Sequence, residues 1–139
     1  MNWKLIILLS LFGLAMGIAT VFVIPSNIEP LFWLVIFVIS AYFIATRCSD
    51  RYFLHGFVVS LANSVWITAA HFLLFDRYVA NHSEEIAMMA TFPLPGTPKL
   101  MTLLMGPVFG VVSGVLLGVF AWLGSRVVEM RSKPSNPDQ

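Results

Sequence analysis

Four long stretches without a charged residue follow one another along the chain, and polar segments separate them. The stretches cover residues 5–24, 31–46, 52–75 and 100–125. A helix needs about 20 apolar residues to cross a hydrocarbon layer roughly 30 Å thick. We therefore predict an all-α integral membrane protein, built as a four-transmembrane-helix bundle that forms a single domain over residues 1–128.

The polar segments predict how the four spans are joined. Pro25 and Pro30 lie around a short polar turn. Residues 47–51, which include Arg47, Asp50 and Arg51, form a second turn. Residues 76–99 are the only long connection, and Asn81 followed by Glu84 is typical of a helix start. We expect a short amphipathic helix in this outer loop between spans three and four. Residues 129–139 are predicted to be a disordered cytoplasmic tail.

The first span has an alternative interpretation. A lone Lys4 followed by an apolar stretch with small residues also describes a cleavable signal peptide. However, the apolar run continues without a break to Ile24, beyond the usual length of a signal-peptide core. A retained helix is therefore the favoured interpretation, with cleavage as the alternative.

Composition and charge agree with a membrane protein and predict its orientation. Hydrophobic residues make up 58% of the chain and charged residues 11%, and the mean hydropathy is +0.86. Cytoplasmic loops carry an excess of Lys and Arg. Such residues gather at the two termini and at the turn 47–51, whereas the other side has only Arg77 and Lys99. Both termini are predicted to be cytoplasmic, in a membrane taken to be a bacterial inner (plasma) membrane.

The third span carries more polar side chains than a lipid-facing helix tolerates. At 100° per residue they fall on one face of the helix, because they recur at helical spacing. Lipid cannot satisfy such groups, so this face should point toward the other helices or toward a water-filled cavity. The predicted polar face consists of Ser60, Asn63, Ser64, Thr68 and His71.

Small residues recur at helical spacing in the first and fourth spans. Glycines separated by four residues let two helix backbones approach closely, which favours packing inside a membrane. The sequence does not tell whether that contact forms within one chain or between chains. The predicted packing glycines are Gly13, Gly17, Gly106, Gly110, Gly114 and Gly118.

The outer loop and the end of span three concentrate side chains that can bind a metal. His71, Asp76, His82 and Glu85 are ligands that suit Zn, Mn or Fe, and we consider a transition-metal site built from them. Their spacing matches no known metal-binding signature. A solvated face of the amphipathic helix is the simpler interpretation.

Three functional hypotheses follow. The first is a non-enzymatic membrane protein that acts by helix-mediated assembly, as a homo-oligomer or with a membrane-protein partner, surrounded by the lipid bilayer. The second is a small channel or transporter lined by the polar face of span three. The third is a membrane metalloprotein or enzyme that uses the outer His and carboxylate groups. The sequence assigns no catalytic residue and contains no evident cofactor motif and no basic nucleic-acid patch, so a nucleic-acid partner is not expected.

Overall fold

The computed structural model describes residues 1–91 and 98–132, and every element in this part of the chain is a helix. Four helices are long and apolar enough to cross a membrane, and each overlaps one of the four predicted spans. The prediction of an all-α chain with four such helices is confirmed. The helices are α1 (Trp3–Phe22), α2 (Glu29–Arg47), α3 (Tyr52–Leu73), α4 (Phe75–Asn81), α5 (Ser83–Ala90) and α6 (Pro98–Ser132).

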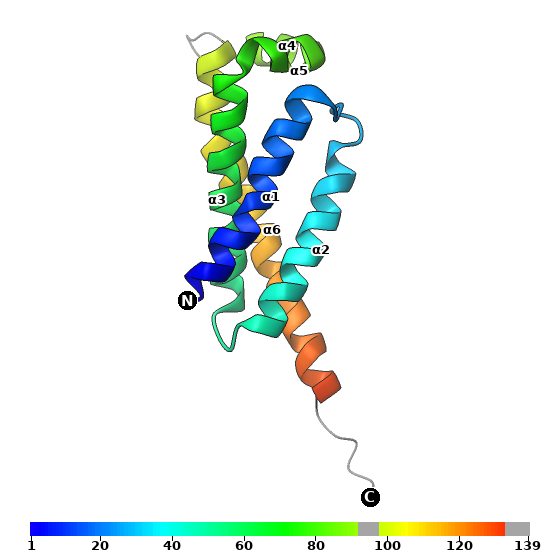
Figure 1. The fold of residues 1–139 in the computed structure, drawn as a ribbon, viewed down its shortest axis with the longest axis vertical. Helices are drawn as coiled ribbons and strands as arrows, with labels where there is room; N and C mark the ends of the chain where they lie inside the picture. Colours follow the sequence, from blue (N-terminus) through cyan, green and yellow to red (C-terminus); the bar gives the residue numbers. More distant parts are fainter. Residues whose placement is uncertain (92–97, 133–139) are drawn as a thin grey trace, which may run out of the picture.

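The four long helices run side by side, and α4 and α5 lie across one end of them (Figure 1). Helix α3 is central, because it packs most extensively on α6 and on α1, while α2 packs mainly on α6. The start of α1 and the turn between α2 and α3 lie toward the opposite end, and α6 extends beyond them there (Figure 1). We call the two ends the α4–α5 end and the N-terminal end.

The sequence explains where α1 and α2 begin and end. The Asn2 side chain accepts a hydrogen bond of 3.1 Å from the Leu5 N–H and so caps the start of α1. Helix α1 ends at Phe22, shortly before Pro25. Pro30 occupies the first turn of α2, where its missing N–H costs no hydrogen bond.

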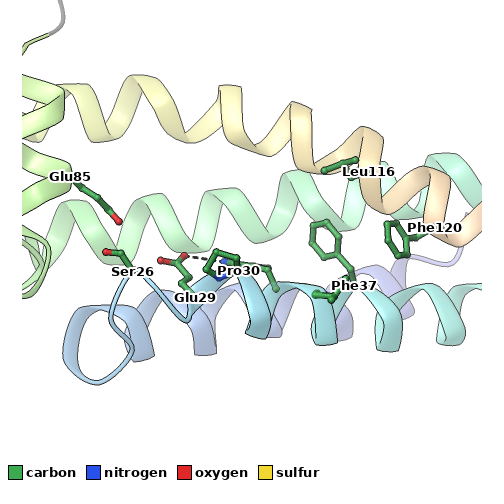
Figure 2. Close-up of a pocket in the computed structure, with 9 residues that line it drawn as sticks. Ser26, Glu29, Pro30, Phe37, Glu85, Leu116 and Phe120 are labelled. Carbon is green, nitrogen blue, oxygen red and sulfur yellow. Dashed lines mark hydrogen bonds between the residues drawn. The ribbon is translucent and has the colours of Figure 1, made fainter.

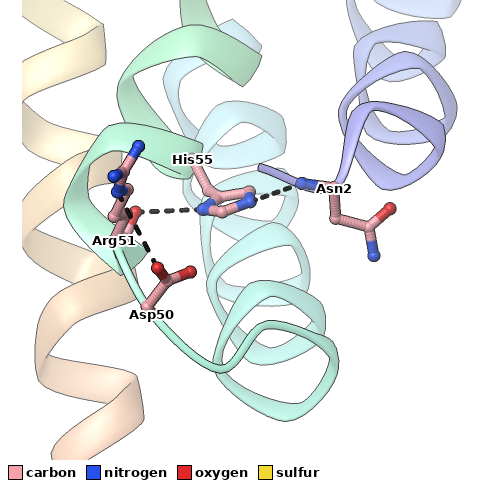
Figure 3. Close-up of polar contacts among 4 residues, drawn as sticks. All are labelled: Asn2, Asp50, Arg51 and His55. Atoms are coloured by element: carbon pink, nitrogen blue, oxygen red, sulfur yellow. Dashed lines mark hydrogen bonds and ion pairs between the residues drawn. The ribbon is translucent and has the colours of Figure 1, made fainter.

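A buried histidine holds the N-terminal end together (Figure 3). His55 donates from Nδ1 to the Arg51 carbonyl at 3.0 Å and accepts from the backbone N–H of Asn2 at 2.8 Å. Its side chain is almost completely buried, whereas the neighbouring Asp50–Arg51 ion pair is exposed. The helical wheel places His55 opposite the polar face. The structure adds that it joins the first residues of the chain to the start of α3.

In its described residues, the connection between α3 and α6 contains two short helices where the sequence predicts one. Helix α4 continues almost directly from α3, and α5 starts two residues after α4 ends. Asn81 lies at the end of α4, and its Nδ2 donates a hydrogen bond of 2.6 Å to the carbonyl of Val21. This side chain therefore connects α4 to the end of α1. At the other terminus α6 continues to Ser132, so it includes the first residues of the predicted tail, and residues 133–139 lie outside the described residues.

The glycines of α6 face α3, where a side chain would meet its neighbour. A Cβ atom at Gly106 or Gly110 would clash with the side chains of Thr68 or Ser64, respectively. On α1, Gly13 and Gly17 face α3 in the same way. Gly114 and Gly118 lie against Phe57 and Phe53, at the N-terminal half of α3. Within the described residues, the predicted packing glycines therefore make their contacts inside one chain.

Candidate functional site

The polar face of α3 is bonded to both helices that flank it. Asn63 lies in the middle of α3, and its Oδ1 accepts a hydrogen bond of 3.0 Å from the backbone N–H of Gly13 on α1. The hydroxyls of Ser60 and Ser113 lie 2.8 Å apart, which links α3 to α6. The polar side chains thus lie inside the bundle, as lipid cannot satisfy them.

His71 lies on the same face, near the α4–α5 end. Its Nε2 is 2.8 Å from the Thr20 hydroxyl of α1, and the whole residue is buried. The ring stacks on that of Tyr78, with 4.1 Å between the ring centroids, and Tyr78 in turn stacks on His82 at 4.4 Å. Three aromatic rings therefore form a continuous stack from α3 to the end of α4.

A cavity of about 700 Å³ lies between the polar face of α3, helix α6 and the start of α2. All five residues of the predicted polar face line it. Ser113 and Thr102 of α6 add hydroxyl groups, and most of the other lining side chains are apolar. Its size lies within the range of pockets that hold small organic molecules, about 300–1,000 Å³.

A second hollow of about 480 Å³ adjoins the cavity on the side where α2 and α6 face each other. Glu29, Trp33, Glu85 and Leu116 line both spaces. Figure 2 shows the two carboxylates at one end of this hollow, and the apolar side chains of Leu116, Phe37 and Phe120 at the other. Acidic groups and apolar surface thus lie at opposite ends of the hollow.

Toward the N-terminal end the bundle is closed. Phe37 packs edge-on against Phe120, with 6.4 Å between the ring centroids. Behind them, Ile44, Val59 and Leu117 are completely buried in one hydrophobic cluster. The cavity therefore ends inside the bundle and does not pass through it.

At the α4–α5 end, three side chains from two separate segments converge. One ligand atom each of Glu29, His82 and Glu85 lies within 4.8 Å of the others. Trp33 Nε1 donates a hydrogen bond of 3.0 Å to Glu29, and the Tyr78 hydroxyl donates a short one to Glu85. We call Glu29, His82 and Glu85 the acid–histidine cluster.

Tyr78 is held in its protonated form, so it can act only as a donor toward Glu85. Burial raises the pKa of its hydroxyl, and so do the hydrogen bond to the Glu85 carboxylate and the negative charge beside it. A phenol donor of this kind orients the carboxylate and leaves its other oxygen available.

The cluster only partly matches the metal site considered from the sequence. His82 and Glu85 belong to it. His71 lies next to it through the Tyr78 ring, but its Nε2 is used by Thr20. Asp76 is exposed and is not a member of the cluster. The sequence analysis missed Glu29, although its loop and the α4–α5 segment are both predicted on the outer side.

No family model, no curated protein and no solved structure matches this chain.

Proposed function

We propose that this chain is a small multi-pass membrane protein that binds a neutral, lipid-soluble molecule in the cavity on the polar face of α3. One observation carries the proposal. Asn63 lines this cavity, and its buried side-chain donor Nδ2 has no hydrogen-bond partner. The proposal uses the same polar face as the second hypothesis from the sequence, a small channel or transporter, but assigns it ligand binding.

The orientation of the Asn63 amide follows from its contacts. Its oxygen accepts from the Gly13 N–H, so the NH₂ group must point the other way. A buried amide donor without a partner costs about 1–3 kcal/mol, and proteins rarely leave one unpaired. A ligand with a carbonyl or ether oxygen would supply the missing acceptor.

The surface of the cavity supports access from the lipid. Phe109 and Val112 of α6 line the cavity, and their exposed fractions are 66% and 57% respectively. In a membrane, these exposed apolar side chains would face lipid chains. A mostly apolar molecule can therefore enter from the bilayer and place its polar atom near Asn63.

Two other functions receive less support. The hydrophobic cluster that closes the N-terminal end argues against a continuous pore in this conformation. Helix-mediated assembly stays a prediction. The packing glycines were its main support, and they already pack against α3 of the same chain.

The binding proposal can be tested with benzophenone. This neutral aryl ketone carries a carbonyl acceptor on an apolar body, and under ultraviolet light it attaches to nearby C–H bonds, those of methionine in particular. We expect labelling of Met105, which lines the cavity, well above that of Met130, which is 68% exposed and does not line it. Peptide mass spectrometry of the purified chain in detergent measures both.

A matched pair of variants provides the control. Leu116→Trp fills the junction between cavity and hollow and should lower Met105 labelling about tenfold, which corresponds to roughly 1.4 kcal/mol. Leu123→Trp introduces the same ring at a position of equal exposure, 51%, away from the cavity, and should leave labelling unchanged. Equal labelling of Met105 and Met130 in the unmodified chain, or equal effects of the two variants, would contradict the proposal.

The orientation is also proposed, with both termini in the cytoplasm and the α4–α5 end outside. The excess of Lys and Arg at the two termini and at residues 47–51 supports it. Reporter fusions after Cys48 and after Gln139 should behave as cytoplasmic, and a fusion after Ser83 as external. A cytoplasmic signal from the Ser83 fusion would reverse the orientation.

A further inference from the structure

We infer that Glu29, His82 and Glu85 form a binding site for one Zn²⁺ ion at the α4–α5 end of the bundle. This goes beyond ligand binding in the cavity and does not depend on it. The three residues come from the start of α2, the junction of α4 and α5, and the first turn of α5. A shared ion would therefore fasten the α4–α5 segment to α2.

The hydrogen bonds of His82 point to a cation. Its Nδ1 lies 3.2 Å from the Tyr78 carbonyl, which can only accept, so Nδ1 carries the proton. Its Nε2 is then left with a lone pair, and this atom is buried and has no partner. The residue as a whole is only 2% exposed. Metal-binding histidines have this same arrangement, in which a carbonyl holds one nitrogen and the other ligates the ion.

A simple ion pair does not account for the cluster. An ion pair would place a nitrogen of His82 within 4.0 Å of a carboxylate oxygen. Among residues 1–91 and 98–132, His82 forms no such pair, although its ligand atom lies within 4.8 Å of both Glu29 and Glu85. Ligands of one zinc ion, each about 2.1 Å from it, lie roughly 3.5 Å apart, so modest side-chain rotation would close the site.

The two carboxylates are held in place by neighbouring donors. Trp33 Nε1 binds Oε1 of Glu29, and the Tyr78 hydroxyl binds Oε2 of Glu85. Each bond uses one oxygen, so the second oxygen of each carboxylate is available to the ion. Hydrogen bonds of this kind orient metal ligands and commonly contribute tenfold or more to the metal affinity.

The ligand set favours zinc over the hard cations. One imidazole and two carboxylates make three protein ligands and leave a fourth position open, as in catalytic zinc sites. Mg²⁺ and Ca²⁺ prefer sites made only of oxygen atoms. Zinc also offsets the two negative charges that the fold brings together beside Trp33.

The test uses the full-length chain in detergent, purified with a tag that contains no histidine and titrated with ZnCl₂ by calorimetry. We expect one Zn²⁺ per chain in the unmodified protein. Glu29→Gln, His82→Gln and Glu85→Gln should each lower the affinity at least tenfold. Glu84→Gln removes the same charge from the adjacent, exposed residue and should leave the affinity unchanged.

Further measurements separate the site from general effects of charge or folding. Zn²⁺ should raise the melting temperature of the unmodified chain and of Glu84→Gln, but not that of Glu85→Gln. If Glu84→Gln and Glu85→Gln lose affinity equally, or if equimolar Mg²⁺ or Ca²⁺ displaces the zinc, the inference is wrong. Benzophenone labelling of Met105 should persist without zinc, so failure of the metal site and failure of the cavity proposal can be told apart.

Discussion

Replacing Gly56 by alanine is expected to destabilise the bundle by about 1–3 kcal/mol, the usual cost of overpacking. A Cβ atom there would lie 2.6 Å from the Leu117 carbonyl oxygen and 2.9 Å from the Gly118 Cα. Both atoms belong to the backbone of α6, which cannot move aside without shifting the whole helix. Gly13→Ala should have a similar effect, because the new atom would lie 2.5 Å from the Cα of Asn63.

Gly124→Ala is the control for this prediction. Its Cβ would lie 3.5 Å from that of Ala45, an ordinary van der Waals distance. Thermal unfolding in detergent, followed by circular dichroism, should therefore show a lower melting temperature for Gly56→Ala and Gly13→Ala and little change for Gly124→Ala. Equal melting temperatures for all three variants would mean that the helices are less closely packed than the structure shows.

The second large effect is expected at His71, where alanine should lower stability and leave zinc binding intact. The substitution removes the contact with Thr20, the stacking on Tyr78 and the volume of a buried ring. A stacked aromatic pair contributes about 0.5–1.5 kcal/mol and a hydrogen bond between membrane helices about 0.6 kcal/mol, so we expect a loss of roughly 1–2 kcal/mol. Unfolding in detergent measures this loss.

The zinc titration decides between two roles for His71. Since its Nε2 faces Thr20 and not the acid–histidine cluster, His71→Ala should lose much less zinc affinity than His82→Gln. Asp76→Asn should also bind zinc normally, because Asp76 is exposed and outside the cluster. A His71→Ala variant that loses zinc but keeps its melting temperature would restore His71 as a metal ligand, as the sequence suggested.

The number and type of the long helices could be predicted from the sequence. Charge is expensive in hydrocarbon, so the uncharged stretches mark the spans almost directly, and the four spans overlap α1, α2, α3 and α6. The helical period also placed the side chains from Ser60 to His71 on one face, without information about neighbours. These features depend on local composition and spacing, which one chain displays by itself.

Other features depend on which helices meet. The glycine spacing indicated close packing, but only the contacts of Gly106 and Gly110 with α3 show that the partner lies in the same chain. Gly56 stands outside any glycine repeat, and its importance follows solely from the nearby backbone of α6. A sequence pattern can reveal a face suited to packing, whereas the identity of the partner is a tertiary property.

The acid–histidine cluster could likewise be predicted only in part from the sequence. The sequence by itself determined that His82 and Glu85 lie close together, because they are three residues apart in one short segment. Only the tertiary structure brought Glu29 to them from the start of α2, more than fifty residues earlier, and turned His71 toward Thr20. The physical reason is that a metal site or a cavity needs atoms from several segments to converge within a few ångströms, and that convergence is decided by how the helices pack.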